Sequence, residues 1–172
     1  MEAERLAKVY SLEPSFIELV LEESDKVYGG VRRALLTLKN NILIANAGID
    51  HANAPVDCVA LWPFDANRTA RDVRKRILKL TGKKIGVIIT DSRTTPLRMG
   101  TIGLALGTAG FDPIIDLRGK PDIYGKKLKI TRLAVADSLA CAANILMGES
   151  NNKTPAVLVR GAPVKIYEKK ES

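Results

Sequence analysis

The sequence has 172 residues, of which 46% are hydrophobic and 27% are charged. This size and composition are typical of one globular domain with its own core, and they exclude disordered and fibrous classes. No apolar run approaches the roughly 18 residues of a transmembrane helix, and the charged residues 1–5 are not followed by the apolar stretch of a secretory signal. Cys58 and Cys141 lack the spacing of a disulfide framework. We therefore expect a cytoplasmic protein without a membrane segment, with residues 1–172 as a single domain or as two small lobes.

Charge is unevenly distributed along the chain. There are 27 basic and 19 acidic side chains, for a net charge of +8, yet residues 1–27 contain seven acidic and three basic side chains. The basic remainder favours an anionic partner such as a nucleotide, a nucleic acid or a polyanionic substrate. An ordinary surface rich in lysine and arginine explains the charge equally well. Only 5% of the residues are aromatic, which does not indicate a base-stacking surface and makes nucleic acid the least favoured partner.

The first third of the chain predicts two helices and a hairpin. Residues 2–9 predict a short helix, and a second helix begins near Pro14 and continues to Val27 before the glycines at 29 and 30. Residues 33–39 and 42–47 predict two strands joined across Asn40 and Asn41, because asparagine tolerates the positive φ of a tight turn. Residues 57–61 predict a further strand.

The remaining two thirds follow a helix–strand pattern. The clearest helix covers residues 66–80, with Gly82 as its C-cap. The apolar run at 85–89 predicts a strand buried on both faces, ended by the polar residues 90–92, and the glycine-rich run at 100–110 predicts close backbone packing. Residues 113–117, 127–132 and 156–159 predict strands, residues 134–147 a helix capped by Gly148, and residues from 161 onward a polar tail. This order predicts an α/β fold with a mixed sheet and packed helices.

Three acidic residues follow the predicted elements. Asp50, Asp91 and Glu149 each lie shortly past the end of a predicted strand or helix, and carboxylates from separate elements suit a hard cation such as Mg²⁺ or Mn²⁺. The hydroxyl of Ser92 would add a further oxygen ligand. For each acid alone a cap or turn role is the commoner one, and the spacing does not show that the three converge. His51 is the one histidine, which excludes a His-rich metal site, and neither a P-loop nor a dinucleotide-binding motif occurs.

Several short motifs occur in a recognisable order. They are Leu-Glu-Glu-Ser at 21–24, Asn-Ala-Gly-Ile-Asp at 46–50 followed by Asn53, Thr-Asp-Ser at 90–92, Met-Gly-Glu at 147–149 and Pro-Ala-Val-Leu-Val-Arg-Gly at 155–161. Further matches are Leu-Thr-Gly-Lys at 80–83, Arg98 with Gly100, and Asp-Ile-Tyr-Gly at 122–125. The ordered set resembles the coenzyme F-420-0:L-glutamate ligase (CofE) family over nearly the whole chain.

The resemblance implies a fold and an activity. It implies an α/β protein that forms an intertwined homodimer, with a nucleotide in a groove near the interface. It also implies a GTP-dependent ligase that joins L-glutamate to the deazaflavin F-420-0 through a γ-glutamyl amide bond, with two divalent cations, Mg²⁺ or Mn²⁺. In such a reaction a carboxylate is activated as an acyl-phosphate, and the amine of glutamate then displaces the phosphate.

The resemblance also implies roles for individual residues. Asp50 and Asp91 would bind one metal ion, and Ser92, where threonine is usual, and Glu149 would bind a second. Asp50, Asp91 and Glu149 are thereby the candidate catalytic residues. Nucleotide contacts are implied for Asn53 and for the segment Met147, Gly148, Glu149, Ser150, Asn151, Asn152, Lys153 and Thr154.

Some features depart from the family pattern. The resemblance implies an additional N-terminal segment with nucleotide contacts and a lysine, and a separate chain is one candidate source of it. Thr94 and Thr95 stand where the family often has Gly-Arg, and the 150–154 loop lacks a glycine before Pro155. An amide-forming ligase, or its catalytic part, is the first interpretation. The alternatives are a divergent member that binds metal or nucleotide or catalyses a related ligation, and a basic RNA-binding or interaction domain.

Overall fold

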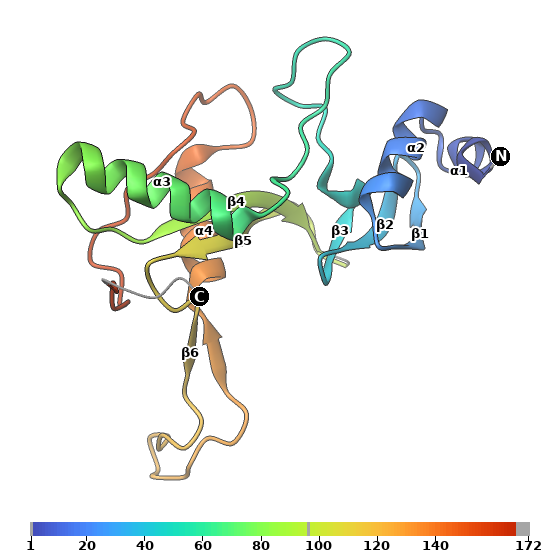
Figure 1. Cartoon of the computed structure of the whole chain (residues 1–172). Coiled ribbons are helices and arrows are strands. Elements are labelled where there is room, and N and C mark those ends of the chain that lie inside the picture. The colour runs from blue at the N-terminus through green and yellow to red at the C-terminus, as the bar shows by residue number, and fades with distance from the viewer. Residues whose placement is uncertain (1, 96, 168–172) are drawn as a thin grey trace. The chain divides into compact units, whose positions relative to one another are not determined.

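The computed structural model describes residues 2–95 and 97–167, which form an α/β fold (Figure 1). The predicted α/β class is confirmed, and the strands of the described residues belong to three small sheets. The chain divides into two compact units. Unit 1 comprises Met1–Trp62 and Arg93–Thr101, and unit 2 comprises Pro63–Ser92 and Ile102–Ser172. None of the helices in the described residues is long and apolar enough to cross a membrane.

Unit 1 packs two helices against a three-stranded antiparallel sheet. Helices α1 (Glu2–Tyr10) and α2 (Pro14–Glu23) precede strands β1 (Lys26–Val31), β2 (Ala34–Lys39) and β3 (Ile42–Ala45), which lie in the order β1-β2-β3. The core residues are Ala3, Leu6, Ala7, Phe16, Ile17, Val20, Leu35, Ala47 and Ile49. The apolar stripe predicted for the second helix therefore forms one core with α1 and the sheet.

The β2–β3 hairpin has the predicted turn, whereas β1 was not predicted. Asn40 and Asn41 have φ values of 51° and 63°, as a two-residue hairpin turn requires. The second helix was predicted to reach Val27 but ends at Glu23, because residues 26–31 pair with β2 instead. Gly29, at a φ of 127°, lies at an irregularity in that register, so a glycine expected to end a helix belongs to a strand.

Unit 2 is built around β4 (Val87–Thr94) and β5 (Thr101–Ala109), which pair and whose ends at 93–101 belong to unit 1. Helix α3 (Ala66–Thr81) was predicted almost to the residue. The Asp65 carboxylate accepts a hydrogen bond from Arg68 N at 2.8 Å at its start, and Gly82 caps its end with a φ of 66°. Helix α4 (Val135–Met147) also agrees with its prediction.

Close packing along β5 is confirmed at two glycines. A Cβ on Gly103 would lie 2.4 Å from the carbonyl oxygen of Ala140 in α4, and one on Gly107 would lie 2.3 Å from the carbonyl carbon of Ala66 in α3. Both helices therefore approach β5 so closely that only glycine fits at these two positions.

Three of the strand predictions are wrong. Strand β4 does not end at residue 89 but continues to Thr94, so Asp91 and Ser92 lie inside it. It is half-buried rather than buried, because its strand neighbour in the described residues is β5 alone and a hollow of about 580 Å³ lies against it. Residues 156–159 form no strand in the described chain and border this hollow, with Leu158 exposed. Residues 57–61 form only the single bridge between Ala60 and Asp50.

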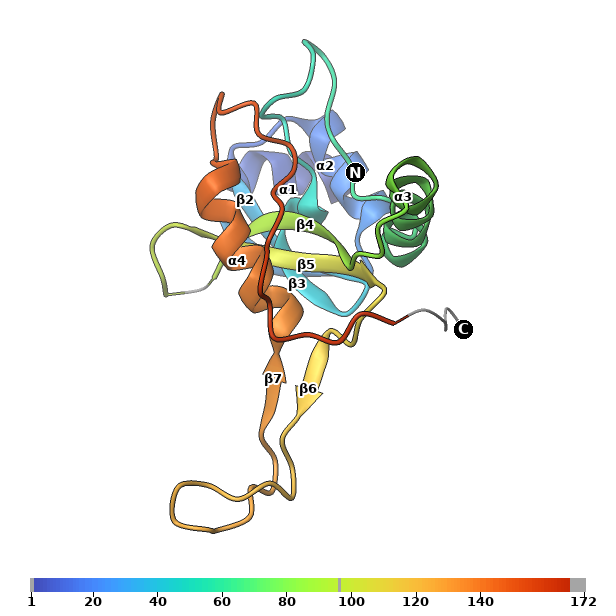
Figure 2. The same cartoon turned by 90° about the vertical axis from the view of Figure 1, so that its left-hand side faces the viewer.

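A hairpin arm extends from unit 2. Strands β6 (Ile114–Asp116) and β7 (Arg132–Ala134) pair, and both views show the loop between them projecting away from α4 and β5 (Figures 1 and 2). The second strand was predicted at 127–132 but begins only at 132, because Lys127 makes a single bridge with Pro121. Of the predicted polar tail, residue 167 donates its N–H to the carbonyl of Gly110, and residues 168–172 lie outside the described residues.

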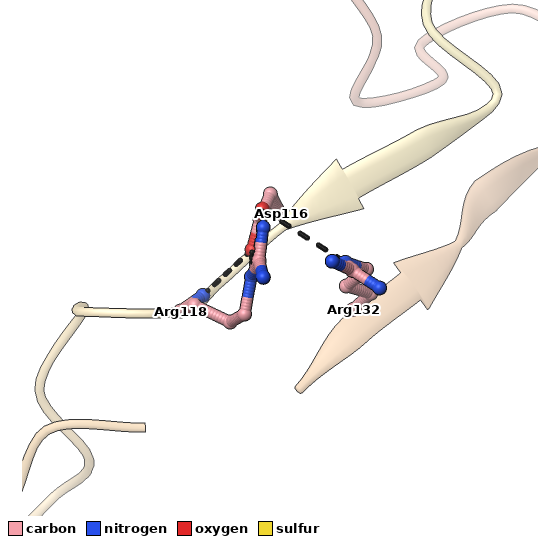
Figure 3. A network of polar contacts seen from close by, with 3 residues as sticks. All are labelled: Asp116, Arg118 and Arg132. Carbon is pink, nitrogen blue, oxygen red and sulfur yellow. Dashed lines mark hydrogen bonds and ion pairs between the residues drawn. The ribbon is translucent and has the colours of Figure 1, made fainter. Parts of the chain in front are cut away.

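Arginine side chains flank one carboxylate on the arm. Asp116 lies between Arg118 and Arg132 (Figure 3). The two side chains of Asp116 and Arg118 are joined by hydrogen bonds, including one of 2.5 Å from Arg118 Nη2, while Arg132 Nε is 3.9 Å away. The hydrogen bonds from Arg118 hold the pKa of Asp116 well below its ordinary value of 3.8. The carboxylate thus stays charged and links the two sides of the arm.

Candidate functional site

A contact between β4 and the end of α4 joins two of the predicted site residues. The hydroxyl of Ser92 donates to Oε2 of Glu149 at 3.0 Å, across 57 residues of sequence. Both residues belong to unit 2. Hydroxyl and carboxylate oxygens from different elements are thereby placed together, as the assignment of both residues to one metal ion requires.

The other oxygen of Glu149 has a partner that was not predicted. Asn144, in the last turn of α4, donates from Nδ2 to Oε1 of Glu149 at 2.7 Å. Its backbone carbonyl accepts the N–H of Gly148 at 2.8 Å. The metal ligands expected from the sequence are acidic and hydroxyl side chains, and Asn144 lies in a region with the sequence pattern of an ordinary helix end.

The segment 147–154 is ordered around Asn152. Gly148 has φ 75° and ψ 170°, a conformation essentially restricted to glycine, and a Cβ there would lie 2.2 Å from Oδ1 of Asn152. The same Oδ1 accepts from the hydroxyl of Ser150 at 3.1 Å, and the Asn152 carbonyl accepts from the hydroxyl of Thr154 at 3.2 Å. The predicted nucleotide segment is therefore a compact turn that begins at a glycine-only position.

Asp91 immediately precedes Ser92 in the strand. Its Oδ1 accepts the backbone N–H of Ser92 at 2.7 Å, and the residue is half-buried. Successive side chains of a strand point to opposite faces. Asp91 and Ser92 therefore lie on different faces of β4.

In unit 1, Asp50 follows a tightly organised turn. Its backbone exchanges both hydrogen bonds with Ala60, and its Oδ1 accepts from Ala52 N at 2.8 Å. This is an Asx turn, which is the structural turn role expected from the sequence as the commoner alternative to metal binding. Asp50 is exposed, as is Asn53, which has a positive φ of 57°, so both are accessible to a ligand.

The turn before Asp50 is held by buried polar contacts. Asn46 Oδ1 accepts from Leu35 N at 2.8 Å, and the buried Thr37 hydroxyl accepts from Ala47 N at 2.8 Å. At Gly48 a Cβ would lie 2.3 Å from the ring of Trp62. The Asn-Ala-Gly motif thus bends the backbone against β2 and Trp62 and fixes the point from which Asp50 projects.

A buried lysine contacts Trp62, the residue against which this turn packs. Lys39 pairs with Glu23 at 2.5 Å, and its ammonium lies 5.6 Å from the centre of the Trp62 ring. The pair connects the end of α2 with the end of β2. A buried cation of this kind needs such a partner.

The structure brings Ser92 and Glu149 together within unit 2. Asp50 belongs to unit 1, whereas Asp91 and Glu149 belong to unit 2, and each unit is described by itself. Among the described residues, no three His, Cys, Asp or Glu side chains form a group that could hold a metal ion. The three-acid site therefore stays a prediction. The lone histidine has another neighbour, because the ring of His51 lies 4.6 Å from that of Phe16.

The chemistry of the donor set fits a hard divalent cation. The oxygens of Ser92 and Glu149 are joined in one contact, and Mg²⁺ and Mn²⁺ prefer carboxylate and hydroxyl oxygens. A hydroxyl has one proton to donate and two lone pairs, so Ser92 can keep its bond to Glu149 while its lone pairs stay available. The fold and this contact define an α/β protein with an oxygen-donor site between a strand and a helix end.

Comparison with known proteins places this chain. The family model F420-0:Gamma-glutamyl ligase matches residues 1–161, so the chain belongs to this family. It is 39% identical over 160 residues to a coenzyme F420:L-glutamate ligase of Methanopyrus kandleri, covering 92% of this chain and 64% of that protein. For proteins of the same name, the identity is 37% over 164 residues in Methanocaldococcus jannaschii, covering 95% of this chain and 66% of that protein. In Archaeoglobus fulgidus it is 42% over 149 residues, covering 87% of this chain and 60% of that protein. The chain thus spans a little under two thirds of the length of these relatives.

Proposed function

We propose that this chain catalyses addition of L-glutamate to coenzyme F-420-0 through a γ-glutamyl amide bond, with GTP and two Mg²⁺ or Mn²⁺ ions. Family membership supports the reaction class, and its relatives are named coenzyme F420:L-glutamate ligases. The contact of Ser92 with Glu149 is the observation that carries the site.

In the proposed reaction a substrate carboxylate attacks the γ-phosphorus of GTP and releases GDP. The amine of glutamate then attacks the acyl-phosphate, and phosphate and a proton leave as the amide forms. Bound cations would neutralise phosphate charge and keep the transferring group in line. Asp50 with Asp91, and Ser92 with Glu149, are the residues proposed to hold them.

The remaining residues of the site would bind the nucleotide. The turn at 147–154 carries the hydroxyls of Ser150 and Thr154 and the side chain of Asn152 in a fixed arrangement, which suits contacts with a polar ligand. Asn53, exposed in unit 1, is the other proposed contact. A second copy of the chain is the proposed partner, since the apolar hollow against β4 offers a surface that an intertwined homodimer would cover.

The test is a mass-spectrometric assay with F-420-0, GTP, L-glutamate and Mn²⁺. We expect a product heavier by one glutamyl residue and GDP release that depends on glutamate. Glu149→Gln keeps the shape of the side chain but removes its charge. Residues that merely orient a metal ligand typically contribute up to about 100-fold to activity. Because Glu149 is proposed as a ligand itself, this change should lower the rate by at least about 100-fold.

Glu18→Gln on the exposed face of α2 is the matched control and should leave the rate unchanged. An active Glu149→Gln protein would contradict the assigned role of Glu149. GDP release without any dependence on glutamate would instead favour the alternative of a family member that binds nucleotide and metal without ligation.

A further inference from the structure

Glu149 occupies an unfavourable place for a carboxylate. It comes two residues after the last residue of α4, and the C-terminal end of a helix carries partial negative charge that favours cations and disfavours anions. The residue is also exposed, so its side chain would lose rotamer freedom on being fixed. The Glu149 carboxylate therefore needs hydrogen-bond donors to keep one position.

Two neutral hydrogen-bond donors, one from α4 and one from β4, hold this carboxylate. Asn144 Nδ2 in α4 bonds Oε1 at 2.7 Å, and the Ser92 hydroxyl in β4 bonds Oε2 at 3.0 Å. Each oxygen thus has one donor, and rotation of the carboxylate would break both contacts. A lysine or arginine at either position would have neutralised the charge, whereas an amide and a hydroxyl orient the carboxylate and leave its charge intact.

The backbone of Asn144 also fixes the position of the main chain just before Glu149. Its carbonyl accepts the N–H of Gly148 at 2.8 Å, directly before the glycine-only turn. The main chain and the side chain of one residue therefore constrain two successive residues, 148 and 149. An asparagine is a weak helix former, so helix stability alone does not favour it at this position.

We propose that Asn144 is a positioning residue for cation binding: its amide keeps Glu149 oriented beside Ser92 while leaving the carboxylate charged for a divalent ion. This inference rests on the proposed function, because it takes Ser92 and Glu149 to be cation ligands. Asn144 itself is assigned no contact with the cation, the nucleotide or the substrate.

The experiment titrates Mn²⁺ alone into the full chain by calorimetry. We expect Asn144→Ala to weaken Mn²⁺ binding by about 10–100-fold, the range typical of residues that orient a metal ligand. Asn144→Gln moves the amide by one methylene and should weaken binding similarly. Alanine and glutamine favour helix more than asparagine does, so melting temperatures should hold or rise in both variants, which separates positioning from a folding role.

The matched control lies on the same helix. The hydroxyl of Ser138 donates to the carbonyl of Ala134 within α4 at 2.9 Å, and Ser138→Ala should leave Mn²⁺ binding unchanged. A second readout is the side-chain amide resonance of Asn144, which should shift when diamagnetic Mg²⁺ is added to the wild type.

The outcomes separate this inference from the proposed function. If wild type and both Asn144 variants bind Mn²⁺ equally, the positioning role is wrong while the cation site stands. If the wild type binds neither Mn²⁺ nor Mg²⁺, the cation site and the positioning role fall together. If Asn144→Ala does not fold, equal binding by Asn144→Gln and the wild type would still overturn the inference.

Discussion

Replacing Gly103 by alanine tests whether the contact of α4 with β5 holds the site in place. The new Cβ would lie 2.4 Å from the carbonyl oxygen of Ala140 and 2.8 Å from the nitrogen of Cys141, where ordinary contact begins at 3.4 Å. These are backbone atoms, so no side chain can rotate away, and the helix must move by about 1 Å. Such overpacking typically costs about 1–3 kcal/mol, which in a chain of this size lowers the melting temperature by about 2–4 °C per kcal/mol.

The assay is urea unfolding together with Mn²⁺ titration. Displacement of α4 should also separate Glu149 from Ser92, so Gly103→Ala should weaken Mn²⁺ binding. Gly100→Ala is the comparison. A Cβ at residue 100 meets no neighbouring atom, but its φ of 87° is unfavourable for alanine. This variant therefore measures backbone strain alone, at about 1–2 kcal/mol. If Gly103→Ala unfolds at the urea concentration of the wild type, the packing argument is refuted.

Two further predictions concern the arm and the turn after α4. The bonds from Arg118 lower the pKa of Asp116 below 3.8, so this pair stabilises the arm above about pH 3.8 and is lost as the pH falls through the lower folded-state value. An NMR titration should show this lowered pKa, and Arg118→Gln should return it towards its ordinary value; no change would contradict the pairing. Gly148→Ala should cost about 1–3 kcal/mol, because it forces a glycine-only conformation and places a Cβ against Asn152. A melting temperature and a Mn²⁺ affinity equal to those of the wild type would rule that out.

Elements with local signals could be predicted from the sequence. Helix α3 has its own cap residues, Asp65 and Gly82. Asn40 and Asn41 have the positive φ of the hairpin turn, which asparagine tolerates through its own side chain. Helix α4 likewise ends at Gly148. In each case the deciding interaction lies within a few residues of sequence, so pattern and propensity are sufficient.

Elements decided by distant partners could not be predicted. Val27 continues the apolar spacing of α2, but pairing with β2 makes residues 26–31 a strand. The apolar residues 156–159 have the composition of a buried strand, yet no strand of the described chain pairs with them and they border a hollow instead. Periodicity reports which residues favour burial and does not report what will cover them.

The corrected extent of β4 changes how the site can work. If Asp91 and Ser92 followed the strand, both could turn towards one ligand. Inside the strand they alternate, so Ser92 contacts Glu149 on one face of β4 and Asp91 lies on the other face. Glu149 reaches its position through Asn144 and Gly148, two residues without charge. Gly148 was predicted as a helix cap and as a nucleotide contact, whereas no sequence pattern indicates the role of Asn144. The chemistry proposed for the site thus depends on backbone geometry at the end of α4 as much as on the carboxylates themselves.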